Sequence, residues 1–140
     1  MIIEGNLLAI ERGLICHQVN CRYAAGAGLA LHIRNRWPEW YRIFKATQPW
    51  LGMVTIYEVH DGLLIANLYA QHAYGQGKRY TNYAALGKCL MEVKRLSASR
   101  DVYLPYGIGC GLAGGDWNIV SQIISDALPN AILVRLPELR

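Results

Sequence analysis

The chain has 140 residues, of which 53% are hydrophobic and 17% are charged, a composition that excludes a disordered protein and indicates a folded one. Its length suits one domain, residues 1–140, and leaves little room for a second. The net charge is +4 and the charged residues are scattered along the sequence. This pattern falls short of a nucleic-acid-binding signature. No apolar run reaches membrane-spanning length, because Glu4, Glu11, Arg12 and His17 interrupt the N-terminal third.

The four cysteines give no sign of a metal site. They form no C-x-x-C pair and no Cys/His cluster with zinc-ligand spacing. The N-terminus also lacks the basic leader and small-residue cleavage site of a signal peptide. We therefore expect reduced cysteines, no metal, no membrane attachment and a cytoplasmic location.

The first third of the chain predicts two strands followed by helix. Residues 1–10 form a short apolar segment that is typical of an edge strand entering a turn. Residues 13–20 are a largely apolar run and predict a buried strand. Residues 29–46 have helical character, and we expect Pro38 to break or restart that helix.

The middle of the chain predicts a β-hairpin over residues 53–71. Two β-rich runs flank Asp61 and Gly62 there, and Asp-Gly is a strong signal for a tight turn between strands. Residues 73–80 follow as a polar and aromatic loop.

The last part of the chain predicts two helices and two short strands. Thr81 is the expected N-cap of a helix that ends near residue 98, and Asp116 the expected N-cap of the next helix. Strands are expected at 101–105 and 131–136. Because strands alternate with helices and the hairpin must be antiparallel, the sequence predicts an α/β domain with a mixed sheet.

Two glycine-rich segments, YAAGAG at 23–28 and GIGCGLAGG at 107–115, each follow a predicted strand and precede a predicted helix. Helix N-termini have unpaired N–H groups that attract phosphate, so one interpretation is a backbone cradle for an anion. The alternative is a pair of tight turns. If neighbouring strands carry the two loops, both line one crevice at the carboxyl ends of the strands.

A dinucleotide-binding fold is a further alternative that the chain length argues against. GCGLAG at 109–114 satisfies the G-x-G-x-x-G pattern, and Glu138 lies at a suitable distance for a ribose contact. The pattern should open the first β-α-β unit, whereas only one further helix and strand follow it here. We therefore reject this interpretation.

Three motifs of the sequence resemble the macro domain family. They are EGNLLAI at 4–10, ICHQVNCRYAAGAGLALHIR at 15–34 and LPYGIGCGLAGGDW at 104–117, and the resemblance spans nearly the whole chain. The sequence looks most similar to the branch of ADP-ribose-1''-phosphate phosphatase-like proteins and ADP-ribose glycohydrolases. The resemblance implies a three-layer α/β/α fold and a cleft that binds ADP-ribose without a cofactor.

The resemblance also implies which residues line that cleft. Asn20 would contact the distal ribose. The loop that covers this ribose matches Gly26, Ala27 and Gly28. The adenine end matches Gly5, Asn6 and Leu7, with Asn6 where the family often has Asp. The loop that wraps the diphosphate matches Gly109, Cys110, Gly111, Leu112 and Ala113, and Gly107 and Ile108 before it are also expected to bind the ligand. The remaining expected binding residues are Cys21, Gln71 and Tyr74.

His17 and Asn20 are the catalytic residues that the resemblance implies. Phosphatase-like members carry a histidine at the place of His17, and a neutral imidazole can act as a general acid or base near neutral pH. The alternative is a histidine that only bonds nearby backbone. In a regular strand His17 and Asn20 face opposite sides, so both reach the cleft only if a bulge or an early strand end intervenes.

The sequence departs from the glycohydrolase pattern at two positions. Gln71 stands at the place of a lysine, and an amide can neither form a Schiff base nor donate a proton as an ammonium does. Ala113 stands at the place of an aspartate. Asp116 lies nearby, where we expect it to cap a helix.

Three functional hypotheses follow. The first is a metal-independent enzyme that binds ADP-ribose and dephosphorylates ADP-ribose 1''-phosphate or hydrolyses a related ADP-ribosyl bond. The second, motivated by Gln71, is a non-catalytic reader that holds ADP-ribose or an ADP-ribosylated macromolecule. The third is a hydrolase of cyclic or nucleic-acid-linked ADP-ribose, in which Lys78 or Arg79 would contact the rest of the substrate.

Overall fold

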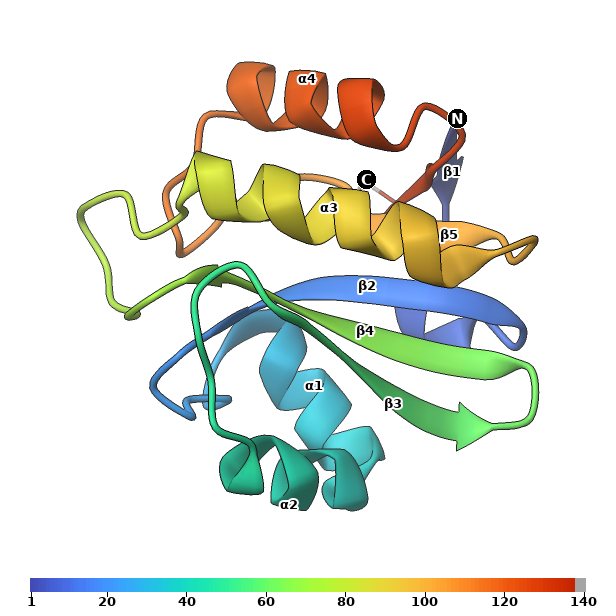
Figure 1. The fold of residues 1–140 in the computed structure, drawn as a ribbon, viewed down its shortest axis with the longest axis horizontal. Helices are drawn as coiled ribbons and strands as arrows, with labels where there is room; N and C mark the ends of the chain where they lie inside the picture. Colours follow the sequence, from blue (N-terminus) through green and yellow to red (C-terminus); the bar gives the residue numbers. More distant parts are fainter. Residues whose placement is uncertain (138–140) are drawn as a thin grey trace.

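A computed structural model describes residues 1–137 and shows a six-stranded sheet between two layers of helices (Figure 1). The strands are β1 (Ile2–Glu4), β2 (Gly13–Asn20), β3 (Val54–His60), β4 (Leu63–Gln71), β5 (Val102–Pro105) and β6 (Ile132–Arg135). Their order is β1-β6-β5-β2-β4-β3. The β3–β4 pair is antiparallel and the other pairs are parallel. The predicted α/β class with a mixed sheet is confirmed.

Two helices cover each face of the sheet. On one face lie α1 (Gly28–Arg36) and α2 (Pro38–Ala46), and on the other lie α3 (Tyr83–Ser97) and α4 (Trp117–Ala127) (Figure 1). A 3-10 turn, η1 (Leu7–Ala9), follows β1. Pro38 is the first residue of α2, where its fixed φ suits a helix start and its missing N–H costs nothing. The predicted break in the helical stretch is thus confirmed.

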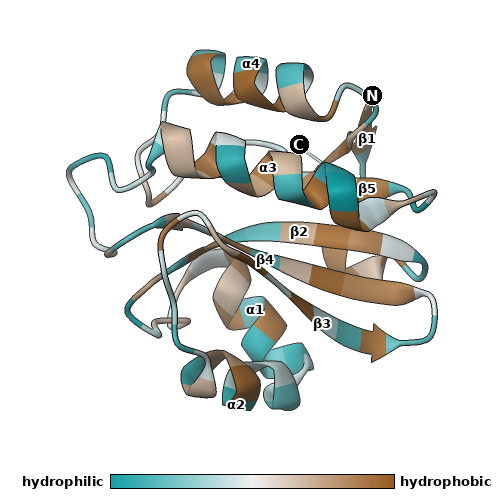
Figure 2. Ribbon diagram, viewed as in Figure 1, coloured by the Kyte–Doolittle hydropathy of each residue, from teal (hydrophilic) through white to brown (hydrophobic). Residues whose placement is uncertain are grey.

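β2 and β4 are the most buried strands because helices pack on both of their faces. Along β2, Leu14 and Cys16 join the core beneath α3 and α4, whereas Val19 joins the core beneath α1 and α2. The first half of β2 is hydrophobic, and its carboxyl-terminal half is more hydrophilic (Figure 2). The polar end of this central strand marks the place where the fold can form a site.

The hairpin between β3 and β4 forms where the sequence predicted it. Asp61 and Gly62 make the turn, and Gly62 has φ +93°, a conformation that glycine adopts at little cost. No helix within residues 1–137 is long and apolar enough to cross a membrane.

The predicted N-cap of α3 is wrong by one residue. The cap is Asn82, whose Oδ1 accepts a hydrogen bond from the backbone N–H of Ala85 at 2.9 Å. Thr81 is extended instead and forms a bridge to Gln71. Its hydroxyl donates to the carbonyl of Gly109 at 2.6 Å. Because the Thr81 side chain makes this bond to a residue distant in the sequence, it does not cap the helix. Asp116 caps α4 as expected, accepting from the N–H of Asn118 at 2.8 Å.

We expect Asn82→Ala to lower the free energy of unfolding by about 1 kcal/mol, because it removes the cap of the longest helix. Urea denaturation of the wild type and the variant measures this difference. Asn118→Ala is the matched control, since Asn118 is exposed and only its backbone N–H takes part in the α4 cap. Equal losses in the two variants would contradict the assignment of the cap.

Candidate functional site

The carboxyl ends of β2, β4 and β5 meet at one edge of the sheet and open into a cavity. These strands are parallel neighbours, so the loops that follow them start side by side. The cavity has a volume of about 550 Å³, which lies within the range of ligand-binding pockets. The two glycine-rich loops thus line one cavity, as the sequence predicted for loops carried by neighbouring strands.

The cavity brings together most of the predicted site residues. Those in its lining are His17, Asn20, Gly26, Ala27, Gly28, Gln71, Tyr74, Gly107, Ile108, Gly109, Gly111, Leu112 and Ala113. The lining does not include Gly5, Asn6, Leu7, Cys21 or Cys110. The Asn6 side chain accepts from the N–H of Leu8 at 2.9 Å and so caps η1.

Sequence analysis missed several residues of the lining. They are Gln18, Val19, Ala24, Leu29, Ala30, Gly75, Pro105 and Tyr106. Tyr106 directly follows β5, so its position at a strand end was a usable signal. Gln18 was harder to find, because it directly follows His17 and so lies on the opposite face of β2.

His17 and Asn20 both line the cavity. His17 pairs with Asn67 of β4, but the register shifts after Val19, and Asn20 pairs with Gln71. The residue left without a partner at this shift is Ala70 of β4, and β2 itself ends at Asn20. The irregularity that the sequence analysis required for both residues to reach the cleft is therefore present.

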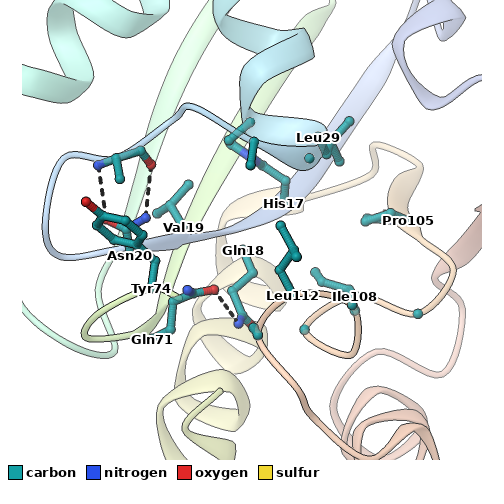
Figure 3. A pocket seen from close by; sticks show the side chains of 18 of the residues that line it. His17, Gln18, Val19, Asn20, Leu29, Gln71, Tyr74, Pro105, Ile108 and Leu112 are labelled. Carbon is teal, nitrogen blue, oxygen red and sulfur yellow. Dashed lines mark hydrogen bonds between the residues drawn. The ribbon is translucent and has the colours of Figure 1, made fainter. Parts of the chain in front are cut away.

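Asn20 shapes the loop that follows β2. Its Oδ1 accepts from the N–H groups of Arg22 at 2.9 Å and Ala24 at 3.2 Å, and its Nδ2 donates to the carbonyl of Ala24 at 2.9 Å. Asn20 and Tyr74 both line the cavity (Figure 3). Asn20 thus holds the glycine-rich loop in its position, whatever contact it makes with a ligand.

Both glycine-rich loops present backbone donors. Within residues 1–137, the N–H groups of Gly26 and Ala27 in the first loop, and of Gly109, Gly111 and Leu112 in the second, pair with no protein acceptor. The first loop runs into α1, whose N-cap Ala27 provides no side-chain cap. Unpaired amides at a helix N-terminus carry partial positive charge and favour anions. Both loops therefore leave backbone donors unpaired, as the interpretation of an anion cradle requires.

Comparisons with known proteins agree with this geometry. No family model matches the sequence. An uncharacterised 17.5 kDa protein of Enterobacteria phage T4 is 28% identical over 137 residues, covering 87% of this chain and 85% of the phage protein. A Bacteroides thetaiotaomicron protein of unknown function is 32% identical, with a TM-score of 0.84 over 98% of this chain and 97% of that one.

A macrodomain protein from Streptomyces coelicolor is 30% identical, with a TM-score of 0.74 over 99% of this chain and 100% of that one. The chain belongs to the macro domain family. A more distant structure, Thermosipho africanus DarTG in complex with ADP-ribose, is 20% identical and has a TM-score of 0.78. The match covers 97% of this chain and 41% of the Thermosipho chain. At this identity it supports the fold alone.

A network of side-chain hydrogen bonds holds the loops of this macro domain together. Nε2 of Gln18 donates to Oε1 of Gln71 and to Oγ1 of Thr81, both at 2.9 Å. The Thr81 hydroxyl in turn donates to the carbonyl of Gly109. Nε2 of Gln71 donates to the carbonyl of Ala73 at 2.9 Å. The Gln71 amide thus makes one hydrogen bond as an acceptor and one as a donor within the protein.

Gly109 lies where this network meets the second loop. A Cβ at Gly109 would lie 2.8 Å from Oε1 of Gln18 and 3.1 Å from Oγ1 of Thr81, and its φ is +75°. Only glycine fits this position without strain. By contrast, a Cβ at Gly26 or Gly111 would meet no atom within 4 Å, so these two residues border open space in the cavity.

His17 forms part of the cavity lining although its side chain is only 1% exposed. Its Nε2 lies 2.6 Å from Oδ1 of Asn67, and its ring packs 5.4 Å from that of Trp40. Burial lowers the pKa of His17 to about 4, against an opposing effect of the bond to Asn67. His17 is therefore neutral near pH 7 and has no proton to donate as a general acid there.

The cavity of this macro domain is almost free of charge. Within the described part of the chain, its lining contains no Asp, Glu, Lys or Arg. Lys78 and Arg79 lie outside the lining, with their cationic groups 5.0 Å from the ring of Tyr80 and 4.5 Å from that of Tyr83. The donors available to an anion in the cavity are therefore backbone amides and uncharged side chains. Glu138, from the rejected dinucleotide interpretation, lies outside the described residues.

We expect the macro domain to lose stability in acid through His17. Its pKa is about 4 when folded and about 6.5 when unfolded, so the unfolded chain binds more protons between these values. The contribution of neutral His17 to the free energy of unfolding is thus fully present above about pH 6.5, and it is lost as the pH drops toward 4. Between about pH 7.5 and about pH 5 this costs on the order of 2 kcal/mol.

Urea denaturation of the wild type and His17→Phe at both pH values tests this expectation. The variant keeps an aromatic ring but cannot titrate, so its stability should vary less with pH by about that amount. The same pH dependence in both proteins would show that His17 is not buried as a neutral ring.

Proposed function

We propose that this macro domain binds ADP-ribose in the cavity at the carboxyl ends of β2, β4 and β5. The observation that carries this proposal is the pair of loops with unpaired amides, at Gly26 and Ala27 and at Gly109, Gly111 and Leu112. Amides of this kind bind a diphosphate without charged side chains. The ligand of the Thermosipho africanus DarTG structure supports the same choice.

The rest of the ligand follows from the shape of the cavity. The distal ribose would lie near Asn20 and Tyr74, close to the loop at 26–28 that runs into α1. The adenosine would extend past Tyr106, which lines the cavity and is 37% exposed. In this pose the adenine would lie toward Asn6, beyond the cavity itself. Tyr106 is held by ring contacts with Trp117 at 4.8 Å, so it offers a fixed aromatic surface to the ligand.

The chemistry of the cavity favours binding over lysine-based hydrolysis. Gln71 is tied to Gln18 and Ala73 and Ala113 carries no acidic group, so the lining has no ammonium or carboxylate to act on a bond. A non-catalytic protein that binds ADP-ribose or an ADP-ribosylated macromolecule is consistent with this uncharged cavity. The exposed mouth leaves room for the attached macromolecule.

Hydrolysis of ADP-ribose 1''-phosphate is a second candidate, favoured by the position of His17. Its neutral ring lies in the cavity lining beside the start of α1 (Figure 3). There it could accept a proton from an attacking water, although it could not protonate a leaving group near pH 7.

We expect isothermal titration to show that ADP-ribose binds at least about 10-fold more tightly than AMP, which lacks the diphosphate and the second ribose. Gly26→Ala and Gly111→Ala should each weaken ADP-ribose binding about 10-fold, because the new methyl group would occupy ligand space while touching no protein atom. Binding should not change when EDTA is added.

Gly87→Ala is the matched control for these variants. A Cβ at Gly87 would make an ordinary contact, 3.7 Å from Ile123 in the packing of α3 on α4. It should alter neither affinity nor stability by much. Wild-type binding of ADP-ribose no tighter than of AMP would sink the proposed function.

The second candidate predicts slow release of phosphate from ADP-ribose 1''-phosphate in the presence of EDTA. His17→Phe should reduce the rate at least about 10-fold, a typical effect of removing a proton acceptor. kcat/KM should fall at low pH with an apparent pKa of about 4, the pKa of the buried His17 ring. A phosphate-release assay across pH measures both quantities. Absence of release by the wild type would leave the reader function alone.

A further inference from the structure

The hydrogen bond between His17 and Asn67 has a direction that can be assigned. Oδ1 of Asn67 lies 2.6 Å from Nε2 of His17 and 2.9 Å from Nε1 of Trp40. An indole N–H can only donate, so the atom of Asn67 between them must be the amide oxygen. The amide nitrogen faces the other way and donates to Oγ1 of Thr55 at 3.0 Å.

The orientation of Asn67 fixes the tautomer of His17. Because Oδ1 accepts, Nε2 of His17 must carry the ring proton, and Nδ1 of the neutral ring then holds a lone pair. Among residues 1–137, this Nδ1 has no hydrogen-bond partner. A buried acceptor without a donor costs about 1–3 kcal/mol. Such a cost is common where a ligand supplies the missing partner.

The unpaired nitrogen belongs to a side chain at the end of the cavity where α1 begins. His17 projects from β2 toward the first turn of α1, beside Leu29 (Figure 3). That turn has no side-chain cap at Ala27, so its N–H groups remain donors. One acceptor and several donors therefore meet at the same end of the cavity. A ligand that satisfies both carries a hydroxyl close to an anionic group.

We propose that Nδ1 of His17 accepts a hydrogen bond from a sugar hydroxyl of the bound ligand, and that Asn67 and Trp40 are positioning residues that hold this acceptor tautomer. The inference rests on the proposed function, because ADP-ribose carries hydroxyl groups close to its diphosphate. His17 then selects the ligand through a hydroxyl and not through charge.

The tautomer can be read from the ring nitrogens of ¹⁵N-labelled protein by long-range ¹H–¹⁵N correlation spectra near pH 7. The signals of His17 are assigned by their loss in His17→Phe. We expect a protonated Nε2 and an unprotonated Nδ1 in the free protein. Saturation with ADP-ribose should move the Nδ1 resonance toward the position of a hydrogen-bonded acceptor. A protonated Nδ1, or an Nδ1 resonance that does not move at saturation, would overturn the inference.

Two variants on either side of Asn67 test the positioning residues. Trp40→Phe removes the donor that orients the amide, so Asn67 can reverse and the second His17 tautomer should appear. Thr55→Val removes the partner of the amide nitrogen but keeps the Trp40 donor to Oδ1, so the wild-type tautomer should persist. A single unchanged tautomer in a folded Trp40→Phe protein would refute the positioning role. If Trp40→Phe does not fold, the wild-type spectra still decide the acceptor assignment.

The affinity of His17→Phe separates this inference from the proposed function. We expect ADP-ribose to bind about 5-fold more weakly, the effect of one net hydrogen bond, while Thr55→Val keeps the wild-type affinity. If the wild type binds ADP-ribose and His17→Phe binds it equally well, the inference fails and the proposed function stands. If the wild type does not bind ADP-ribose, the function and the ligand contact fail together, and the spectrum of the free protein still decides the tautomer.

Discussion

The parallel pairing of β2 with β5 is the constraint on which the site depends. Parallel strands end at the same edge of a sheet, so the glycine-rich loops that follow these two strands are forced to face each other. The unpaired amides of both loops then belong to residues that line one cavity. In any order that separated β2 from β5, the same loops would be two unrelated turns.

Loops with unpaired backbone groups need other contacts to keep their shape. Hydrogen bonds of Ala113, Gln18, Thr81 and Gln71 provide them here. The carbonyl of Ala113 accepts from the N–H groups of Tyr80 and Thr81, at 2.7 and 3.1 Å. Gln18 links Thr81 to Gln71, and Thr81 holds Gly109. Uncharged side chains thus hold the loops in place, while the amides of the residues that line the cavity remain unpaired. Gln71, which stands where the resemblance places the lysine of glycohydrolases, is part of this network.

The layers, the hairpin, the helix break at Pro38 and the loop at 107–113 could be predicted, because each depends on local sequence. Pro38 and the Asp61-Gly62 turn act through their own backbone geometry. The cap at Asn82 could not be predicted, because Thr81 is a good cap that a bond to Gly109 withdraws. The bulge after Val19 could be stated only as a condition, since register depends on β4. The set of residues that line the cavity follows from that register.

The burial of His17 links the fold to the chemistry of the cavity. A histidine in the more polar half of a buried strand predicts an acid or base near neutral pH, but Trp40 and Asn67 enclose this ring and burial lowers its pKa to about 4. The same enclosure that keeps the ring neutral also fixes its orientation, since a ring packed against Trp40 and bonded to Asn67 has a single arrangement of its nitrogens. A cavity built in this way recognises its ligand by the direction of hydrogen bonds: amides donate to the anionic part, and a lone pair on the strand accepts from a neutral part. Charged side chains would bind many anions about equally well, whereas fixed donors and a fixed acceptor fit only a ligand that presents both groups at matching places.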